Sequence, residues 1–378
     1  MEYALSELFT LQMGKTPSRD NSSYWKKSEN NWISIADLTN SGKYISNTKE
    51  TLSDSAVAES GIKKIPANTV IMSFKLSLGK VAITEKEMYS NEAIMAFIDK
   101  GVEKISPEYL YYLLRAKDWS NGTNKAVMGA TLNKATLSTI KIQLHEYDNQ
   151  LGIVNMLNRV SSSIDFRKQQ LTKLDELIKA RFVEMFGDPY TNSKDYPLKK
   201  GESFFKLSNG KAVPESKRLN GGIPAYGGNG ISWYTDESLF DADTIVVGRV
   251  GFQSGNVHLV KGPLWVTDNA MYMSSCDFSQ YNLTFLIELM AHVDFTKFQD
   301  AGDLKKITQK PFMQFEYLCP PLSLQNQFSA FVAEVDKSKL LVGSAAAHKP
   351  FDIGFFSQKH CATPCKRGII SSKHVIFH

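Results

Sequence analysis

Residues 150–160 read QLGIVNMLNRV, and residues 325–335 read QNQFSAFVAEV. Both segments begin with glutamine and place apolar residues three, seven and ten positions later, which is the spacing of one face of an α-helix. The second segment follows the first by 175 positions. Solenoid and propeller units recur at about 20–50 residues, so a period this long indicates a duplicated domain.

Other short segments repeat in the same order. Residues 69–72 (TVIM) return as 244–247 (TIVV), 79–81 (GKV) as 255–257 (GNV) and 109–114 (YLYYLL) as 285–290 (FLIELM), each 175 or 176 positions later. The opening segment 8–15 (LFTLQMGK) corresponds to 204–211 (FFKLSNGK), 196 positions later. The repeats predict two similar modules on one chain, an arrangement suited to holding a target at two places.

The size and composition of the chain limit its class. A length of 378 residues suggests two or three domains at about 100–200 residues each. No apolar run reaches the roughly 18 residues of a membrane span, and the N-terminal residues MEYA lack the pattern of a signal peptide. Four cysteines in so long a chain do not make a disulfide framework. We therefore expect a cytoplasmic protein that does not enter a membrane.

The charge of the chain is only mildly basic. There are 44 lysines and arginines against 39 aspartates and glutamates, which gives a net charge of +5. An excess of this size is typical of a solvated surface and does not by itself indicate binding to nucleic acid.

Short β-favouring segments separated by turn residues fill residues 1–147. The predicted strands are bounded by glycine, proline, asparagine or serine and lie at 32–35, 69–72, 81–83 and 94–98. Residues 109–115 follow Pro107 and predict a short helix. Residues 190–321 repeat this pattern with more glycine. The sequence therefore predicts an α+β fold with two tandem mixed α/β modules.

A long helix is predicted between the modules, over residues 148–189. Apolar side chains recur there in alternating steps of four and three, which is a heptad pattern. The seam residues are Ile153, Leu157, Val160, Ile164, Leu171, Leu174 and Ile178. A helix of about forty residues measures roughly 60 Å, and Gly187-Asp188-Pro189 would end it.

A second helix is predicted over residues 322–342, directly after two prolines. Phe328, Val332 and Val335 continue the apolar spacing. Because each module must return the chain to the start of the next helix, we expect the two helices to form an antiparallel, coiled-coil-like pair. The second helix is the shorter one, since residues 343–378 lack heptads and predict an irregular tail.

Several enzyme and ligand signatures are absent from the sequence. The glycine-rich segment 221–230 lacks the Gly-Lys-Ser/Thr ending of a P-loop and the strand–helix context of a dinucleotide site. His360, Cys361 and Cys365 lack the second ligand pair of a zinc finger, so we expect no metal. No serine-hydrolase, zinc-protease or kinase motif occurs. We therefore expect a protein that is not an enzyme.

The chain resembles the specificity subunit of a type I restriction–modification system. The resemblance rests on a set of motifs that together extend to about residue 342. They are LFTLQMGKTP at 8–17, FGDP at 186–189, GIPAYGGNG at 222–230, VVGRVG at 246–251 and PPLSLQ at 320–325. Each motif is weak alone, but their order and duplication are specific.

The resemblance implies a non-catalytic subunit that reads double-stranded DNA. Each module would be a target recognition domain for one half of a split, asymmetric sequence. The helices would set the spacing and dock methyltransferase subunits, which bring S-adenosylmethionine, while a restriction subunit brings ATP and Mg²⁺. Two features depart from the family pattern: LHEY at 144–147 replaces Pro-Pro-Leu, and the second helix is short, which would weaken helix pairing and docking.

Candidate DNA contacts lie on the loops of the modules, where Arg or Lys pairs with guanine and Asn or Gln with adenine. Arg249 and Lys75 each follow a repeated strand, while Lys15 and Lys211 follow the repeated glycine and could touch phosphate. The remaining candidates are Lys80, Tyr226, Asn229 and Trp233. Each of these side chains could instead serve only the fold or the surface. The alternative function is a two-module scaffold that binds protein or glycan.

Overall fold

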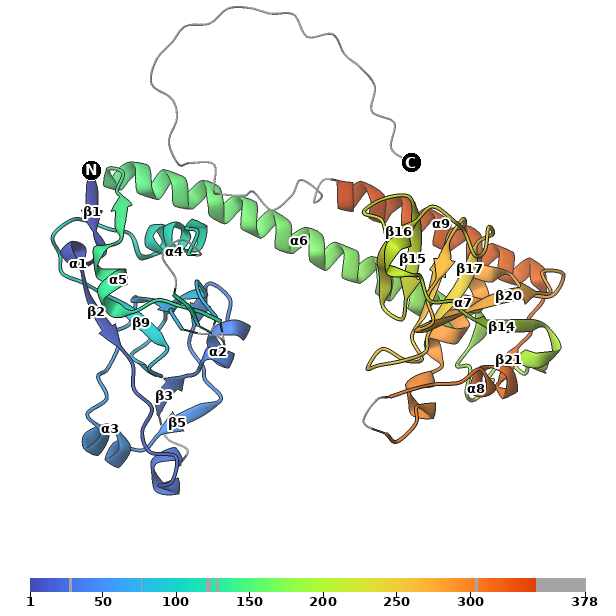
Figure 1. Cartoon of the computed structure of the whole chain (residues 1–378), viewed down its shortest axis with the longest axis horizontal. Helices are drawn as coiled ribbons and strands as arrows, with labels where there is room; N and C mark the ends of the chain where they lie inside the picture. Colours follow the sequence, from blue (N-terminus) through green and yellow to red (C-terminus); the bar gives the residue numbers. More distant parts are fainter. Residues whose placement is uncertain (27–28, 76, 120–123, 127–128, 303–304, 345–378) are drawn as a thin grey trace, which may run out of the picture. The chain divides into compact units, whose positions relative to one another are not determined.

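The computed structural model describes residues 1–26, 29–75, 77–119, 124–126, 129–302 and 305–344. Within the described residues the chain forms two compact units, unit 1 (residues 1–163) and unit 2 (residues 164–344). Helix α6 (Tyr147–Phe186) contributes its first residues to unit 1 and the remainder to unit 2 (Figure 1). The predicted tail from residue 345 onward lies outside the described residues.

Unit 1 is built on two sheets. The larger one has the order β2 (Phe9–Met13), β9 (Ile94–Asp99), β6 (Val70–Ser73), β7 (Val81–Thr84), β4 (Tyr44–Ile45). The smaller one has the order β5 (Glu50–Leu52), β3 (Asn30–Ile33), β8 (Tyr89–Ser90). The two ends of the module meet where β1 (Glu2–Ala4) pairs with β12 (Lys141–Gln143).

The helices of unit 1 are short apart from α6. They are α1 (Leu5–Leu8), α2 (Ile35–Asn40), α3 (Asp54–Ser60), α4 (Pro107–Ala116), α5 (Lys134–Thr139) and the 3₁₀ turn η1 (Ser22–Trp25). A hairpin is formed by β10 (Asn124–Ala126) and β11 (Gly129–Thr131). The helix predicted at 109–115 lies within α4, whose first turn carries Pro107 as expected.

Unit 2 has the same kinds of sheet. The larger has the order β14 (Phe205–Asn209), β20 (Ala270–Cys276), β17 (Thr244–Gly248), β18 (Val257–Val260). The smaller has the order β16 (Gly230–Thr235), β15 (Ile223–Gly227), β19 (Trp265–Val266). The module is closed by β13 (Leu198–Lys200) paired with β21 (Glu316–Leu318).

The helices of unit 2 include the second long helix. They are α7 (Leu283–His292), α8 (Lys310–Gln314) and α9 (Leu322–Ser344), with 3₁₀ turns η2 (Gly201–Ser203), η3 (Glu215–Lys217) and η4 (Phe295–Phe298). Helix α9 therefore extends to residue 344, two residues beyond the predicted end of the second helix.

The duplication is visible strand by strand. Strands β2, β9, β6 and β7 of unit 1 correspond to β14, β20, β17 and β18 of unit 2, in the same sheet order. Each smaller sheet combines one antiparallel and one parallel pairing. The predicted fold class, two mixed α/β modules and long helices, is confirmed.

The central strand of each larger sheet is buried on both faces. In β6, Val70 and Met72 belong to one core cluster while Ile71 belongs to another. In β17, Ile245 and Val247 face one cluster and Val246 the other. Successive side chains of a strand point to opposite faces, so a strand covered on both sides needs a continuous apolar run rather than an alternating one.

Helices α6 and α9 pack antiparallel within unit 2. Phe182 and Phe186, near the end of α6, each have ring centroids 5.6 Å from that of Phe328, near the start of α9. Near the other end of α9, the Arg167 Nη1 atom donates to the Val342 carbonyl at 3.2 Å. Early residues of one helix thus meet late residues of the other, as the sequence predicted.

The predicted seam needs correction at Val160 and Ile164, which are 48% and 40% exposed. The physical reason is the reach of α9, because Val342 already lies at Arg167, near the end of the described part of that helix. Ile153 instead packs against the core of unit 1.

Leu157 in unit 1 and Leu171 in unit 2 are only partly buried. Leu174 packs against the core of unit 2, and Ile178, Phe328, Val332 and Val335 belong to it. Phe182 and Phe186, which the predicted heptad pattern did not include, are fully buried in the core of unit 2. They follow Ile178 in steps of four, the i, i+4 spacing of neighbours on one helix face.

A buried glutamine fixes the start of each long helix. The Gln150 side chain accepts a hydrogen bond from the Ser106 amide (3.0 Å) and donates to two backbone carbonyls, those of Lys104 and His145. The Gln325 side chain does the same with the Asn282 amide (2.8 Å) and the carbonyls of Gln280 and Pro320. The repeated glutamine of the sequence therefore has one structural role in both units.

We expect Ile178→Asp to destabilise unit 2 by several kcal/mol, because it places an unpaired carboxylate in an apolar core. Ile164→Asp is the matched control on an exposed part of the same helix and should cost less than about 1 kcal/mol. Urea unfolding of the full chain, followed by circular dichroism, measures both. Equal effects of the two substitutions would contradict the burial described above.

We also expect Gln325→Met to lower the free energy of unfolding, because it keeps the side-chain volume but removes three buried hydrogen bonds. Each buried group left without a partner costs about 1–3 kcal/mol. Gln327, two residues further along α9, is exposed, so Gln327→Met serves as the control and should have little effect. If the two variants gave the same thermal unfolding curve, the hydrogen bonds of Gln325 would not stabilise the start of α9.

Candidate nucleic-acid interface

In unit 2 the segment at residues 265–269, which begins with β19 and is called the 265–269 loop below, forms hydrogen bonds with three of the predicted contact residues. The Lys211 amide donates to the Val266 carbonyl at 2.8 Å. The Thr267 amide donates to the Tyr226 carbonyl at 2.9 Å. Lys211 lies just after β14 and Tyr226 lies on β15, and residues 266 and 267 join them through backbone hydrogen bonds.

The same loop reaches Arg249 and the hairpin that carries Asn229. The Arg249 amide donates to the Asn269 carbonyl at 2.9 Å, and its Nη1 donates to the Asp268 carbonyl at 3.2 Å. Gly228 lies close to Asn269, since a Cβ added to Gly228 would be 3.5 Å from the Asn269 carbonyl oxygen. Asn229 is exposed at the turn between β15 and β16. Three predicted residues of unit 2, Lys211, Tyr226 and Arg249, thus bond to one loop, and Asn229 follows Gly228 beside it.

Trp233 has a different neighbour. It lies on β16 opposite Ala225, and the Arg218 guanidinium is 4.1 Å from the centroid of its ring. Its indole Nε1 is buried without a hydrogen-bond partner in the described part of the chain. The structure therefore supports a contact between Trp233 and a cation of the protein itself.

The predicted residues of unit 2 differ in exposure. Lys211 and Asn229 are exposed, whereas Tyr226, Trp233 and Arg249 are partly buried. Burial, with a smaller contribution from Tyr234, raises the pKa of Tyr226, so its hydroxyl stays protonated and can donate a hydrogen bond at neutral pH.

Unit 1 has the same backbone arrangement at residues 89–93. The Lys15 amide donates to the Ser90 carbonyl at 2.8 Å, as Lys211 does to Val266. The Phe74 amide donates to the Ala93 carbonyl at 2.9 Å, as Arg249 does to Asn269. The residue equivalent to Arg249 is therefore Phe74, and Lys75 is one position further along.

The remaining lysines of unit 1 lie around the β6–β7 connection. The Lys75 Nζ atom is 5.2 Å from the ring centroid of Phe74. The Lys80 Nζ atom donates to Thr39 Oγ1 at 2.6 Å, at the end of α2. The Lys15 Nζ atom donates to the Ser60 carbonyl. All three side chains thus have partners within the protein.

A glycine precedes Lys15 and Lys211 because the backbone comes too close for a side chain. A Cβ on Gly14 would lie 2.2 Å from the Ser90 oxygen, and one on Gly210 would lie 2.1 Å from the Thr267 oxygen. Real Cβ atoms do not make such contacts, so this Gly-Lys repeat marks where each loop is held against the first strand of the larger sheet.

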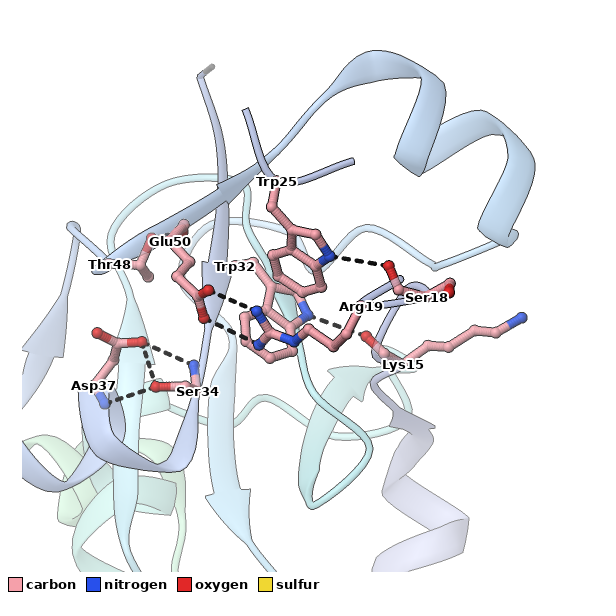
Figure 2. A network of polar contacts seen from close by, with 9 residues as sticks. All are labelled: Lys15, Ser18, Arg19, Trp25, Trp32, Ser34, Asp37, Thr48 and Glu50. Atoms are coloured by element: carbon pink, nitrogen blue, oxygen red, sulfur yellow. Dashed lines mark hydrogen bonds and ion pairs between the residues drawn. The ribbon is translucent and has the colours of Figure 1, made fainter. Parts of the chain in front are cut away.

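A second group of residues in unit 1 was missed by the sequence reasoning (Figure 2). The Arg19 guanidinium carbon lies 3.5 Å from the ring centroid of Trp25, and two hydrogen bonds join Arg19 to Glu50. Trp32 donates from its indole Nε1 to the Lys15 carbonyl at 3.0 Å. The available signal was an arginine and two tryptophans closely following the Gly14-Lys15 repeat.

The charges in this region of unit 1 are coupled. Hydrogen bonding from Arg19 is the main cause that lowers the pKa of Glu50. Burial alone would raise the pKa of Glu92, but a hydrogen bond from Thr16, its own amide, and the nearby Lys75 and Arg19 lower it overall. Both carboxylates are therefore ionised at neutral pH and balance the cations around them.

Two kinds of feature are absent from the described ranges of the chain. In that part of the chain no group of three or more His, Cys, Asp or Glu side chains is placed to hold a metal ion. Likewise, none of the helices resolved there is long and apolar enough to cross a bilayer. Cys361 and Cys365 lie outside these ranges.

Comparison with known proteins identifies relatives. Residues 1–176 match the family described as type I restriction modification DNA specificity domain. The EcoprrI specificity subunit of Escherichia coli is 21% identical over 88% of this chain and 86% of its own length. The MjaIX specificity subunit of Methanocaldococcus jannaschii is 27% identical over 66% of this chain and 55% of its own length.

Solved structures share the fold. The S subunit of a type I restriction–modification system from M. genitalium superposes with a TM-score of 0.56 at 14% identity, covering 92% of both chains. A second chain has a TM-score of 0.55 at 13% identity and covers 93% of this chain and 94% of its own. It comes from work on complex assembly and conformational transition of the type I system.

The resemblance expected from the sequence is confirmed by these matches, which carry the names of specificity subunits and not of catalytic subunits. The curated match to the E. coli protein extends over most of the chain, whereas the family match covers its first 176 residues. Residues 1–176 therefore match the family described as type I restriction modification DNA specificity domain, and the chain as a whole is similar to the specificity subunits of type I restriction enzymes.

Proposed function

We propose that the chain reads a split DNA sequence, one half with each unit, as the non-catalytic specificity subunit of a type I restriction–modification complex. The observation that carries this proposal is the repeated loop. Residues 89–93 and 265–269 hold Lys15 and Lys211 by equivalent backbone hydrogen bonds. Two equivalent loops with different side chains suit one frame that reads two different half-sites.

The chemistry of the loop residues supports a division between phosphate and base contacts. A lysine acts as a point charge and suits phosphate, which positions the protein on the duplex without reading sequence. Arginine and asparagine form paired hydrogen bonds with guanine and adenine in the major groove. Lys211 therefore suits phosphate, while Arg249 and Asn229 suit base edges. Tyr226 adds a hydroxyl donor beside them.

The partners follow from the same proposal. Methyltransferase subunits would bind the long helices and supply S-adenosylmethionine, and a restriction subunit would supply ATP and Mg²⁺, in the cytoplasm where the DNA lies. Large apolar side chains exposed on these helices support docking of other proteins. On α6 these include Met156 (69% exposed) and Phe166 (61%), and on α9 Leu340 (72%) and Leu341 (75%).

Exchange of residues 190–321 for the same module of a relative tests the proposal. Because each unit has its own sheets and core, the exchange should alter one half of the methylated sequence and leave the other half and the spacer unchanged. Single-molecule sequencing of genomic DNA, with and without the gene, gives the readout. A motif that changed in both halves would refute the proposal that each unit reads its half-site independently. If the methylation pattern were the same with and without the gene, a scaffold that binds protein or glycan would be favoured.

Lys211→Ala tests the phosphate contact. Loss of one phosphate contact should weaken binding alike for all sequences and reduce the slope of log K against log salt by about 1. Lys297→Ala is the control, because Lys297 is 66% exposed and pairs with Asp294 at 3.6 Å. Binding of the assembled complex to duplex DNA, measured at several salt concentrations, should distinguish them. An unchanged slope for Lys211→Ala would remove this residue from the interface.

A further inference from the structure

Arg19 is held in a single orientation in unit 1 (Figure 2). Its guanidinium carbon lies 3.5 Å from the ring centroid of Trp25 and 5.1 Å from that of Trp32. Its Nη1 and Nη2 atoms donate to Glu50 Oε1 and Oε2 at 2.6 and 3.0 Å. Stacking sets the plane of the guanidinium, and the paired hydrogen bonds set its rotation within that plane.

The backbone around Glu50 is held in place by hydrogen bonds. The Thr48 hydroxyl donates to the Glu50 carbonyl at 2.7 Å, and the Lys49 amide donates to Asp37 Oδ1 at 3.0 Å. Asp37 is fixed in turn, because it forms a capping box with Ser34 at the start of α2. The carboxylate is therefore presented from a backbone that other side chains hold in place.

The contact with Glu50 leaves donors of Arg19 available. A guanidinium has five N–H groups, and Glu50 engages one on each terminal nitrogen. No other protein group within the described residues accepts from the Nε–H of Arg19, whose side chain is 50% exposed. Nε–H and the adjacent Nη–H form a parallel pair of donors, which matches the O6 and N7 acceptors of guanine.

The cluster also lies next to the proposed interface. The Trp32 indole donates to the carbonyl of Lys15, the residue that unit 1 places against the 89–93 loop. An open groove of about 710 Å³ borders the cluster and is lined in part by Trp25 and Glu50.

We propose that Arg19 reads a guanine in the half-site bound by unit 1 and that Glu50 is its positioning residue. This inference rests on the function proposed above. Arg19 follows Lys15 by four positions, whereas Glu215 follows Lys211 by four. The contact proposed for Arg19 therefore has no counterpart at the equivalent position of unit 2.

The size of the expected effect separates this role from a phosphate contact. A bidentate arginine–guanine pair contributes roughly 5- to 150-fold discrimination against the wrong base. A phosphate contact would weaken every sequence to the same degree. An exposed ion pair such as Arg19–Glu50 contributes about fivefold or less to stability, so its loss alone should leave the unit folded.

Arg19→Lys is the decisive variant, because it keeps the charge but loses the planar pair of donors. We expect the preference for guanine to fall about 5- to 150-fold at one position of one half-site. Glu50→Gln should give a smaller loss at that same position. The matched controls are Arg159→Lys, on an exposed residue of α6, and Glu87→Gln, whose carboxylate is 63% exposed and pairs with Lys64.

The readout is the methylated motif found by single-molecule sequencing in cells that contain the full complex, with thermal unfolding of each variant as a check of folding. Relaxation at one position of one half-site supports the inference. An unchanged motif, or an even loss of methylation at all sites, overturns it while the proposed function stands. A wild-type gene whose deletion changes no methylation would overturn both.

Replacement of the implicated guanine by 7-deazaguanine tests the atomic contact, because it removes the N7 acceptor. The complex with Arg19 should bind the modified duplex more weakly than the natural one. An Arg19→Ala complex, whose side chain has no donor at this position, should bind both duplexes alike. Equal losses in the two complexes would show that another side chain contacts N7 and would overturn the assignment.

Discussion

A buried glutamine at the start of each long helix is the interaction on which both units depend. Gln150 and Gln325 are 2% and 0% exposed, and each satisfies one backbone amide and two carbonyls. The amide belongs to the first turn or cap of α4 or α7, so the glutamine joins a helix of the module to the long helix. A buried amide side chain tolerates few arrangements, because each unpaired group costs free energy. This requirement sets the direction in which each long helix leaves its module.

Beyond this shared contact, the two units hold their long helices by different chemistry. In unit 1 polar groups add to the apolar packing of Ile153: Lys43 Nζ donates to Glu108 Oε1 at 2.6 Å and to Asn158 Oδ1 at 2.8 Å. Burial alone would raise the pKa of Glu108, but hydrogen bonds led by that from Lys43 lower it. In unit 2 the contact is aromatic, with Phe182, Phe285 and Phe328 in one core. Polar contacts depend on pH and salt more than apolar ones do, so the attachment of unit 1 is the one that solution conditions can weaken.

The candidate interface combines a repeated backbone with side chains that differ. Lys15 and Lys211 keep the same hydrogen bond to their loops, and Phe74 and Arg249 keep another. The side chains at the second pair have no chemistry in common, one being a phenyl ring and the other a guanidinium. Backbone hydrogen bonds place a loop without regard to its side chains, which allows the two units to present different groups at the same location. Two copies of one frame can thus present two different sets of side chains.

The sequence by itself determined the features that depend on local pattern. Repeated segments revealed the duplication, Pro107 marked the start of α4, and the apolar spacing located α6 to within a few residues of Tyr147–Phe186. Only the tertiary structure decided which apolar positions are covered. Val160 and Ile164 fit the heptad but are exposed, whereas Phe182 and Phe186 are buried beside Phe328. Arg19 and Glu50 likewise meet although they lie 31 positions apart. Periodicity along a helix is local, but burial depends on whether another element lies beside it, and that is settled only when distant parts of the chain pack together.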